Sequence, residues 1–407
     1  MLAGMLFKIA RRLFVFSVIA FVLIGLVQCS DGSSRSKTAI APYKYSLLRW
    51  ELGNFSDKWV RKFQDILPWN SVASREVRID RAKEFFDLIV EMNELERRPE
   101  SAESVKRISE LRQRRIDMQP EVEETIESEI SSVLVDEGFS SRIGVIFPPV
   151  DTVFTKSPSA LILSPRERID HIGSTLLKPG ISGDTRGKLE DLIFQEDGVS
   201  ALIVNTGGVA TYPSVITASG NLRDVLAITA HEWLHHWFFF QPLGQHFWDS
   251  SGMMTLNETA ASIGGEIVGD RAFTAMTGEK VTRTPYREPT DPAGFDYNVA
   301  MRETRVTTEA LLANGKIEEA ETYMEDRRQF MADEGIYIRK INQAFFAFYG
   351  SYATSAASAS PIGDQLEELH GQSRTLGEFL QIVGNFDEVE DLANYLRPVG
   401  IGHIHGE

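Results

Sequence analysis

The residues best suited to chemistry lie near the middle of the chain, in the segment His231-Glu232-Trp-Leu-His235. No Gly or Pro interrupts residues 222–240, so we expect the segment to lie within one helix. On a helix, residues four apart lie on one face, and both imidazoles can reach an ion about 2.0–2.1 Å away. Glu232 can take a proton from a metal-bound water, whose pKa the metal lowers. The pattern predicts zinc-assisted hydrolysis, with His231 and His235 as ligands and Glu232 as the general base.

The surroundings of these residues argue against a simple packing role. Apolar side chains occupy almost every face of the predicted helix 222–240: Val225, Leu226, Ile228, Trp233, Leu234, Trp237 and Phe238. A helix that is apolar all round is buried, and buried imidazoles and carboxylates are costly unless they are paired or ligated. This cost favours metal ligation over packing.

A catalytic zinc uses three protein ligands, so a third ligand is expected. Glu258 lies in a second predicted helix, 254–276, and follows His235 by 23 residues. The loop around 241–252 contains Gly and Pro, which lets the two helices pack antiparallel. Four small residues near Glu258 would permit a close approach: Ala260, Ala261, Gly264 and Gly265. Glu258 is therefore the predicted third ligand.

With Glu258 included, the sequence resembles the gluzincin metallopeptidases, in which a Glu on a following helix completes the H-E-x-x-H site. Asn257-Glu-Thr-Ala-Ala261 fits the Asn-Glu-x-x-Ala motif of their aminopeptidase-like branch. Thermolysin-like enzymes place an acidic residue four after the Glu ligand, whereas this chain has Ser262. Residues 341–352 are also similar to a family of predicted exported bacterial aminopeptidases. The resemblance implies Zn²⁺ and a peptide or protein substrate.

Two further features are candidates for supporting roles. The segment 209–217 resembles the edge strand that holds a peptide by backbone pairing in this class. Tyr349 and Tyr352 are candidates to stabilise the transition state, although an aromatic packed near a helix end is the simpler interpretation.

The other histidines are weaker candidates for metal ligands. A metzincin site needs a third His six residues after the second, and position 241 is Gln. His236 points about 100° away from His235 on the helix, so a core role is expected. His246 lies in a loop and remains a minor candidate, as do His403 and His405 in the tail.

Composition limits the other classes of function. The chain has 407 residues and a formal net charge of -16, which disfavours nucleic-acid binding because phosphate contacts need clustered Lys and Arg. Cys29 is the single cysteine, so an intramolecular disulfide or a Cys-rich metal site is excluded.

Residues 1–30 have the pattern of a targeting signal. Lys8, Arg11 and Arg12 precede an apolar run that begins at Leu13, which predicts export with the rest of the chain outside. The residues before Cys29 resemble a bacterial lipoprotein signal, which makes Cys29 a candidate for lipidation. An uncleaved anchor and cleavage followed by secretion remain alternatives. We expect an extracytoplasmic protein attached to a bacterial-type membrane, on the periplasmic side or the cell surface.

The pattern along the chain predicts a mostly helical α+β fold with a small β-sheet packed on the active-site helix. The expected parts are a linker at 31–43, a helical hairpin or support domain at 44–138, a zincin-like catalytic core at 139–277, a loop at 278–299 and a C-terminal helical subdomain at 300–407. In finer detail, we expect a helical hairpin within 101–137 and helices at 166–177 and 336–356.

Hydrolysis of a peptide bond is thus the leading hypothesis. One alternative is a membrane-tethered helical interaction protein whose zinc is structural or absent. The charged surface of the predicted hairpin is consistent with this alternative. Another is a zincin-fold hydrolase of a non-peptide amide.

Overall fold

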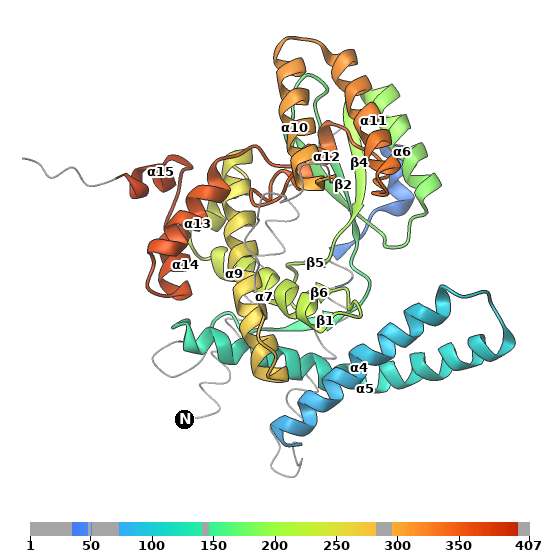
Figure 1. Cartoon of the computed structure of the whole chain (residues 1–407), viewed down its shortest axis with the longest axis vertical. Helices are drawn as coiled ribbons and strands as arrows, with labels where there is room; N and C mark the ends of the chain where they lie inside the picture. Colours follow the sequence, from blue (N-terminus) through green and yellow to red (C-terminus); the bar gives the residue numbers. More distant parts are fainter. Residues whose placement is uncertain (1–34, 48–49, 51–72, 141–145, 282–294, 398–407) are drawn as a thin grey trace, which may run out of the picture.

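The computed structural model describes residues 35–47, 50, 73–140, 146–281 and 295–397. Within these ranges the fold is α+β and mostly helical, as the sequence predicts, with two small three-stranded sheets (Figure 1). The predicted targeting segment with Cys29, most of the segment 48–72, most of the loop 278–299 and the tail histidines lie outside the described residues. No described helix is both long and apolar enough to cross a membrane.

Two antiparallel helices form the centre of the fold, α7 (Leu222–Phe238) and α9 (Ser251–Thr277), joined through the short helix α8 (Pro242–Gln245). Asn221 begins α7 by accepting hydrogen bonds from the backbone N–H groups of Arg223 and Asp224. Ser250 caps α9 in the same way through the N–H of Met253. Both helices begin where the sequence supplies a capping side chain.

Glycines of α9 allow the two backbones to approach closely. A methyl group on Gly265 would lie 2.9 Å from the carbonyl oxygen of Ala227 and from the backbone nitrogen of His231. A methyl group on Gly269 would lie 2.6 Å from the Cα of Ala227. Such contacts are shorter than real Cβ atoms make, so only glycine fits there. The close approach expected from the small residues is confirmed.

The first sheet lies beside α7 and has the strand order β1-β6-β5. Its strands are β1 (Thr152–Phe154), β5 (Gly208–Val209) and β6 (Ser214–Ile216), with β1 parallel and β5 antiparallel to β6. The single strand predicted at 209–217 is therefore two strands joined by a turn. The two edge strands of this sheet are β1 and β5, and β6 lies between them.

The second sheet has the order β3-β2-β4 and is antiparallel throughout. Its strands are β2 (Ser159–Ser164), β3 (Gly173–Leu177) and β4 (Ser200–Asn205). Alternate side chains point to opposite faces, which α6 (Gly183–Asp197) and α12 (Gln343–Tyr349) cover. The helix predicted at 166–177 is wrong, because residues 173–177 pair with β2 along the whole of β3.

The helical hairpin exists, but its turn is earlier than predicted. It consists of α4 (Arg75–Glu96) and α5 (Ala102–Asp136), which runs unbroken through Pro120. Proline removes one helical hydrogen bond, at a cost of about 3 kcal/mol. Leu111 before it packs on α4, and Val122 after it is fully buried in the main core, so packing on both sides keeps the helix continuous. The hairpin predicted within 101–137 is thus wrong.

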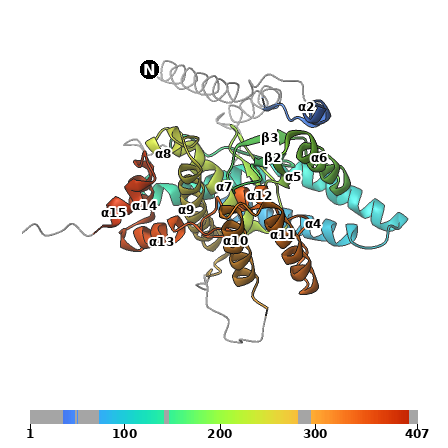
Figure 2. The same cartoon turned by 90° about the horizontal axis from the view of Figure 1, so that it is seen from above.

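The C-terminal helices lie in two places. One group packs near the second sheet: α10 (Tyr297–Ala313), α11 (Ile317–Asp333) and α12. The other lies beside α9, on the side of the molecule opposite the turn of the α4–α5 hairpin: α13 (Ile362–Gln372), α14 (Leu376–Gly384) and α15 (Glu390–Leu396) (Figure 2).

The long helix predicted at 336–356 is only the seven-residue α12. It begins at Asn342, whose side chain accepts a hydrogen bond from the N–H of Phe345. Beyond Tyr349 the chain turns toward α9, where the N–H of Ala353 donates to the hydroxyl of Thr259 at 2.9 Å. This contact draws residues 350–353 toward the centre of the fold.

We expect Gly265→Ala to destabilise the protein by about 1–3 kcal/mol, because the added methyl group overpacks the α7–α9 contact. Thermal unfolding should show a lower midpoint. Gly187→Ala is the matched control, since a methyl group at this position of α6 would meet nothing within 4 Å. Equal midpoints for the two variants would contradict the close-packing argument.

Candidate metal centre

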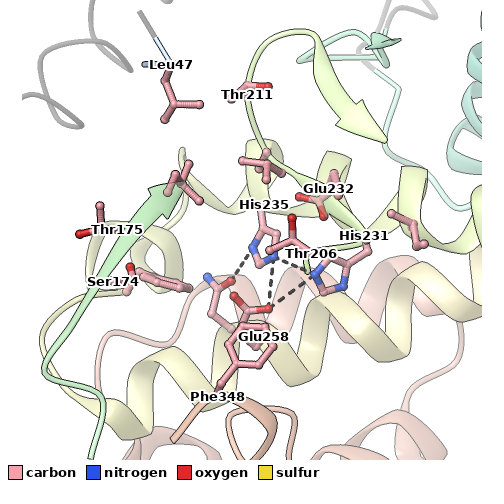
Figure 3. Close-up of a pocket in the computed structure, with 18 of the residues that line it drawn as sticks. Leu47, Ser174, Thr175, Thr206, Thr211, His231, Glu232, His235, Glu258 and Phe348 are labelled. Carbon is pink, nitrogen blue, oxygen red and sulfur yellow. Dashed lines mark hydrogen bonds and ion pairs between the residues drawn. The ribbon is translucent and has the colours of Figure 1, made fainter. Parts of the chain in front are cut away.

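Three predicted ligands meet between α7 and α9. The Nε2 atoms of His231 and His235 lie 3.0 Å apart, and each lies 3.5 Å from Oε2 of Glu258 (Figure 3). Within the described ranges, this is the only group of three or more His, Cys, Asp or Glu residues with the geometry to hold a metal ion. The i, i+4 spacing places both imidazoles on one face of α7, and the antiparallel α9 brings Glu258 opposite them.

The donor geometry fits a tetrahedral ion. Donors about 2.0–2.1 Å from a zinc ion at tetrahedral angles are about 3.3 Å apart, and the three separations here lie on either side of that value. Oε2 of Glu258 is buried and has no well-formed hydrogen bond to any described residue. A cation between the three side chains would satisfy this oxygen, whose burial is otherwise costly.

Asn257 orients the second histidine. Its side-chain oxygen lies 2.9 Å from Nδ1 of His235, so Nδ1–H donates and the lone pair of Nε2 points into the site. On the other imidazole, Nδ1 of His231 lies 3.5 Å from the hydroxyl of Ser262, where thermolysin-like enzymes have an acidic residue. The sequence includes Asn257 in its motif, but its role in orienting His235 is seen only in the structure.

The electrostatics of the site favour a positive charge beside Glu258. Burial opposes ionisation of Glu258, but His235 and His231 outweigh it and hold the pKa of this carboxyl well below its usual value. Burial also lowers the pKa of His235, yet the Glu258 carboxylate outweighs that effect and raises it to about 9. The three side chains thus favour a positive charge between them, where a metal ion would lie.

Glu232 lies next to the cluster but does not belong to it. Its side chain is buried, and burial raises the pKa of its carboxyl above the ordinary value, while His231 and His235 act in the opposite direction. The carboxylate lies over Gly208 of strand β5, where an added methyl group would come within 2.5 Å of Oε1. Glycine at position 208 thus leaves the space that Glu232 occupies.

The two candidate tyrosines differ in their positions. The ring of Tyr352 lies 6.3 Å from that of His231, and the charge of Glu258, together with burial, raises the Tyr352 pKa well above its ordinary value. Tyr349 is 37% exposed and packs against the ring of Phe345, with centroids 4.6 Å apart. The turn after α12 therefore brings Tyr352 to the metal centre and leaves Tyr349 farther out.

The remaining histidine candidates do not join the cluster. His236 packs against Tyr212, and burial lowers its pKa to about 4, as expected for a core histidine. His246 pairs with Asp249 at 2.6 Å on the exposed side of its loop.

A cleft of 2260 Å³ opens onto the three ligands. The edge strand β5 borders one side of the cleft and β3 borders another (Figure 3). Its walls include Phe247 and Trp248, which follow α8 and also line a smaller neighbouring pocket that His171, in the loop before β3, borders. None of these three residues was predicted from the sequence. An aromatic pair in a loop between the two ligand-bearing helices is a signal for Phe247 and Trp248, whereas His171 has none, because it reaches the site through sheet pairing.

We expect His231→Ala and Glu258→Ala to lose bound metal, because two donors rarely retain an ion that needs three. Asn257→Ala should weaken metal affinity by about 10–100-fold through loss of the orienting hydrogen bond. Elemental analysis of the dialysed proteins measures both effects, with His246→Ala as the control that keeps its metal. Full metal retention by Glu258→Ala would place the third ligand elsewhere.

No family model matches this chain, no curated protein matches its sequence and no solved structure matches its fold.

Proposed function

We propose that this protein is a zinc-dependent metallopeptidase of the gluzincin type, attached to a membrane and facing away from the cytoplasm. The observation that carries the proposal is the convergence of His231, His235 and Glu258, with Glu232 held beside them. Two imidazoles and a carboxylate suit zinc, and three protein ligands leave a fourth position open for chemistry.

The edge strand β5 supports a peptide as the substrate. Gly207 accepts a hydrogen bond from the N–H of Thr217, and the next pair along the ladder is Gly208 with Ile216. Because hydrogen-bonded and non-hydrogen-bonded pairs alternate in an antiparallel ladder, the N–H and C=O of Gly208 point away from β6. An extended peptide can pair with these two groups directly beside Glu232.

The residues of the site have separate roles in peptide hydrolysis. Bound zinc would polarise the scissile carbonyl and acidify a water molecule. Glu232 takes a proton from that water as its oxygen bonds to the carbonyl carbon, and returns the proton to the amide nitrogen as the C–N bond breaks. The products are a carboxylate and an amine. Tyr352 donates a hydrogen bond to the oxygen on which charge develops.

We expect Glu232→Gln to keep its zinc and to lose turnover by about 10²–10⁴-fold, because the amide cannot accept the proton. The measurement is cleavage of a mixed peptide library, followed by mass spectrometry, alongside elemental analysis. Glu325→Gln on the outer helix α11 is the control with the same chemical change. Unchanged turnover in Glu232→Gln would contradict the proposed role of Glu232 as the general base.

Membrane attachment is proposed from the basic residues and apolar run of residues 1–30 and from Cys29 as a lipidation site. Deleting residues 1–30 should move the chain from the membrane fraction to the soluble fraction of a bacterial host, as immunoblotting of the fractions would report. Incorporation of a labelled fatty acid separates the two modes of attachment, because a lipid-anchored chain carries the label on Cys29 and loses it in Cys29→Ser, whereas an uncleaved anchor carries no label. A deleted chain that stays in the membrane fraction would contradict the proposal.

A further inference from the structure

A small pocket opens off the main cleft beside Glu258. Its volume is 130 Å³, and it shares six lining residues with the cleft: Ser174, Phe247, Trp248, Glu258, Phe348 and Tyr352. A side chain of a substrate lying in the cleft can therefore enter it without leaving the metal centre.

The walls of this pocket are mainly apolar and come from distant parts of the chain. Ala160 and Ile162 extend from β2, Met254 from the first turn of α9, and Ala347 from α12. No Lys, Arg or Asp is among the described residues that line it. Glu258 also lines the pocket, but its carboxylate is directed to the two histidines. His171, Ser174, Ser351 and Tyr352 also line the pocket. With Glu258 holding the proposed metal, a charged side chain would exchange its full hydration for these few uncharged polar groups, which is costly.

The rim of the pocket is aromatic. Phe247 and Trp248 stack edge to face with ring centroids 4.6 Å apart, and Phe247 lies 6.4 Å from the ring of His235. Trp248 is nevertheless 64% exposed, which is unusual for so large an apolar side chain next to a cleft. An apolar group seated in the pocket would cover these rings.

The volume limits the size of the occupant. A water molecule takes up about 30 Å³, so the pocket holds on the order of four waters, or the four carbon atoms of a leucine side chain. We propose that this pocket is the specificity site of the enzyme and that it selects a leucine-sized, uncharged side chain on a residue flanking the scissile bond. The inference rests on the proposed peptidase function.

The first test compares blocked peptides that differ only at one residue flanking the cleaved bond: Leu, Ala, Lys or Trp. We expect the full-length protein in detergent to prefer Leu over Ala by at least about 10-fold in kcat/KM, and to prefer Leu over Lys and Trp, because even one methylene in an apolar pocket is worth about 10–200-fold. Equal rates for Leu, Ala and Lys would overturn the proposal.

Variants of the pocket wall make the test specific. Ala347→Leu fills the pocket and should abolish the preference for Leu over Ala while cleavage of the Ala peptide continues. Met254→Ala enlarges the pocket and should raise the rate for Trp relative to Leu, which keeps the test decisive if Ala347→Leu does not fold. Ala356→Leu is the matched control, because Ala356 packs in the same core without lining the pocket. Variants that leave every ratio unchanged would overturn the proposal.

Binding separates this inference from the proposed function. Titration calorimetry on the Glu232→Gln protein measures peptide affinity without turnover. Suppose that no peptide is cleaved, that the Leu peptide binds more tightly than the Ala peptide, and that Ala347→Leu removes the difference. The proposed binding role of the pocket is then supported, and the proposed peptidase function is contradicted. If peptides are cleaved without side-chain preference, the peptidase function is supported and the proposed role of the pocket is contradicted. Absence of both cleavage and binding overturns both.

Discussion

The close packing of α7 against α9 is the constraint on which the rest of the structure depends. Gly265 and Gly269 bring the α9 backbone against Ala227 and His231, at distances that no larger residue permits. Because the helices are antiparallel, this contact sets Glu258 opposite the two imidazoles one turn apart on α7. A wider spacing between the helices would separate the carboxylate from the histidines and leave three buried polar groups without partners, which is costly.

The same packing gives two neighbouring carboxylates opposite properties. Glu258 faces His231 and His235, and their charges hold its pKa below the usual value in spite of burial. Glu232 lies one residue along α7 from His231, under the backbone of Gly208, where burial dominates and raises its pKa. Environments that push the pKa values of two acids apart are characteristic of acid–base sites, because one group stays ionised while the other exchanges a proton.

Elements outside the helix pair shape the space around the site. Carboxylates of α5 close the outer edge of the first sheet: Glu123 and Glu127 accept hydrogen bonds from the N–H groups of Phe154 and Thr152. Because α5 already accepts hydrogen bonds from the backbone of β1, β5 is the edge strand that is left to face the cleft. On the other side, the second sheet and α12 contribute the wall of the small pocket. The helices therefore hold the proposed reacting groups, and the two sheets border the space for a substrate.

The sequence by itself determined the features that depend on local geometry. Four residues on a helix make slightly more than one turn, so His231 and His235 share a face wherever α7 lies. The small residues of α9 and the position of Glu258 after a Gly- and Pro-containing loop could also be identified from the sequence. They led to the cluster of three ligands and to the mostly helical α+β class.

Only the tertiary structure decided the features that depend on contacts between distant segments. Pro120 predicts a helix break, but packing on both sides of it outweighs the lost hydrogen bond. Tyr352 lies beside the three candidate ligands and Tyr349 lies farther out, because residue 353 is hydrogen-bonded to α9 just after α12 ends. Gly208 reaches the cleft through pairing of β5 with β6, and the pairing of β3 with β2 brings the loop of His171 to the small pocket. Periodicity reports which face of an element is buried but not which distant residue meets it, so these positions could not be predicted from spacing alone.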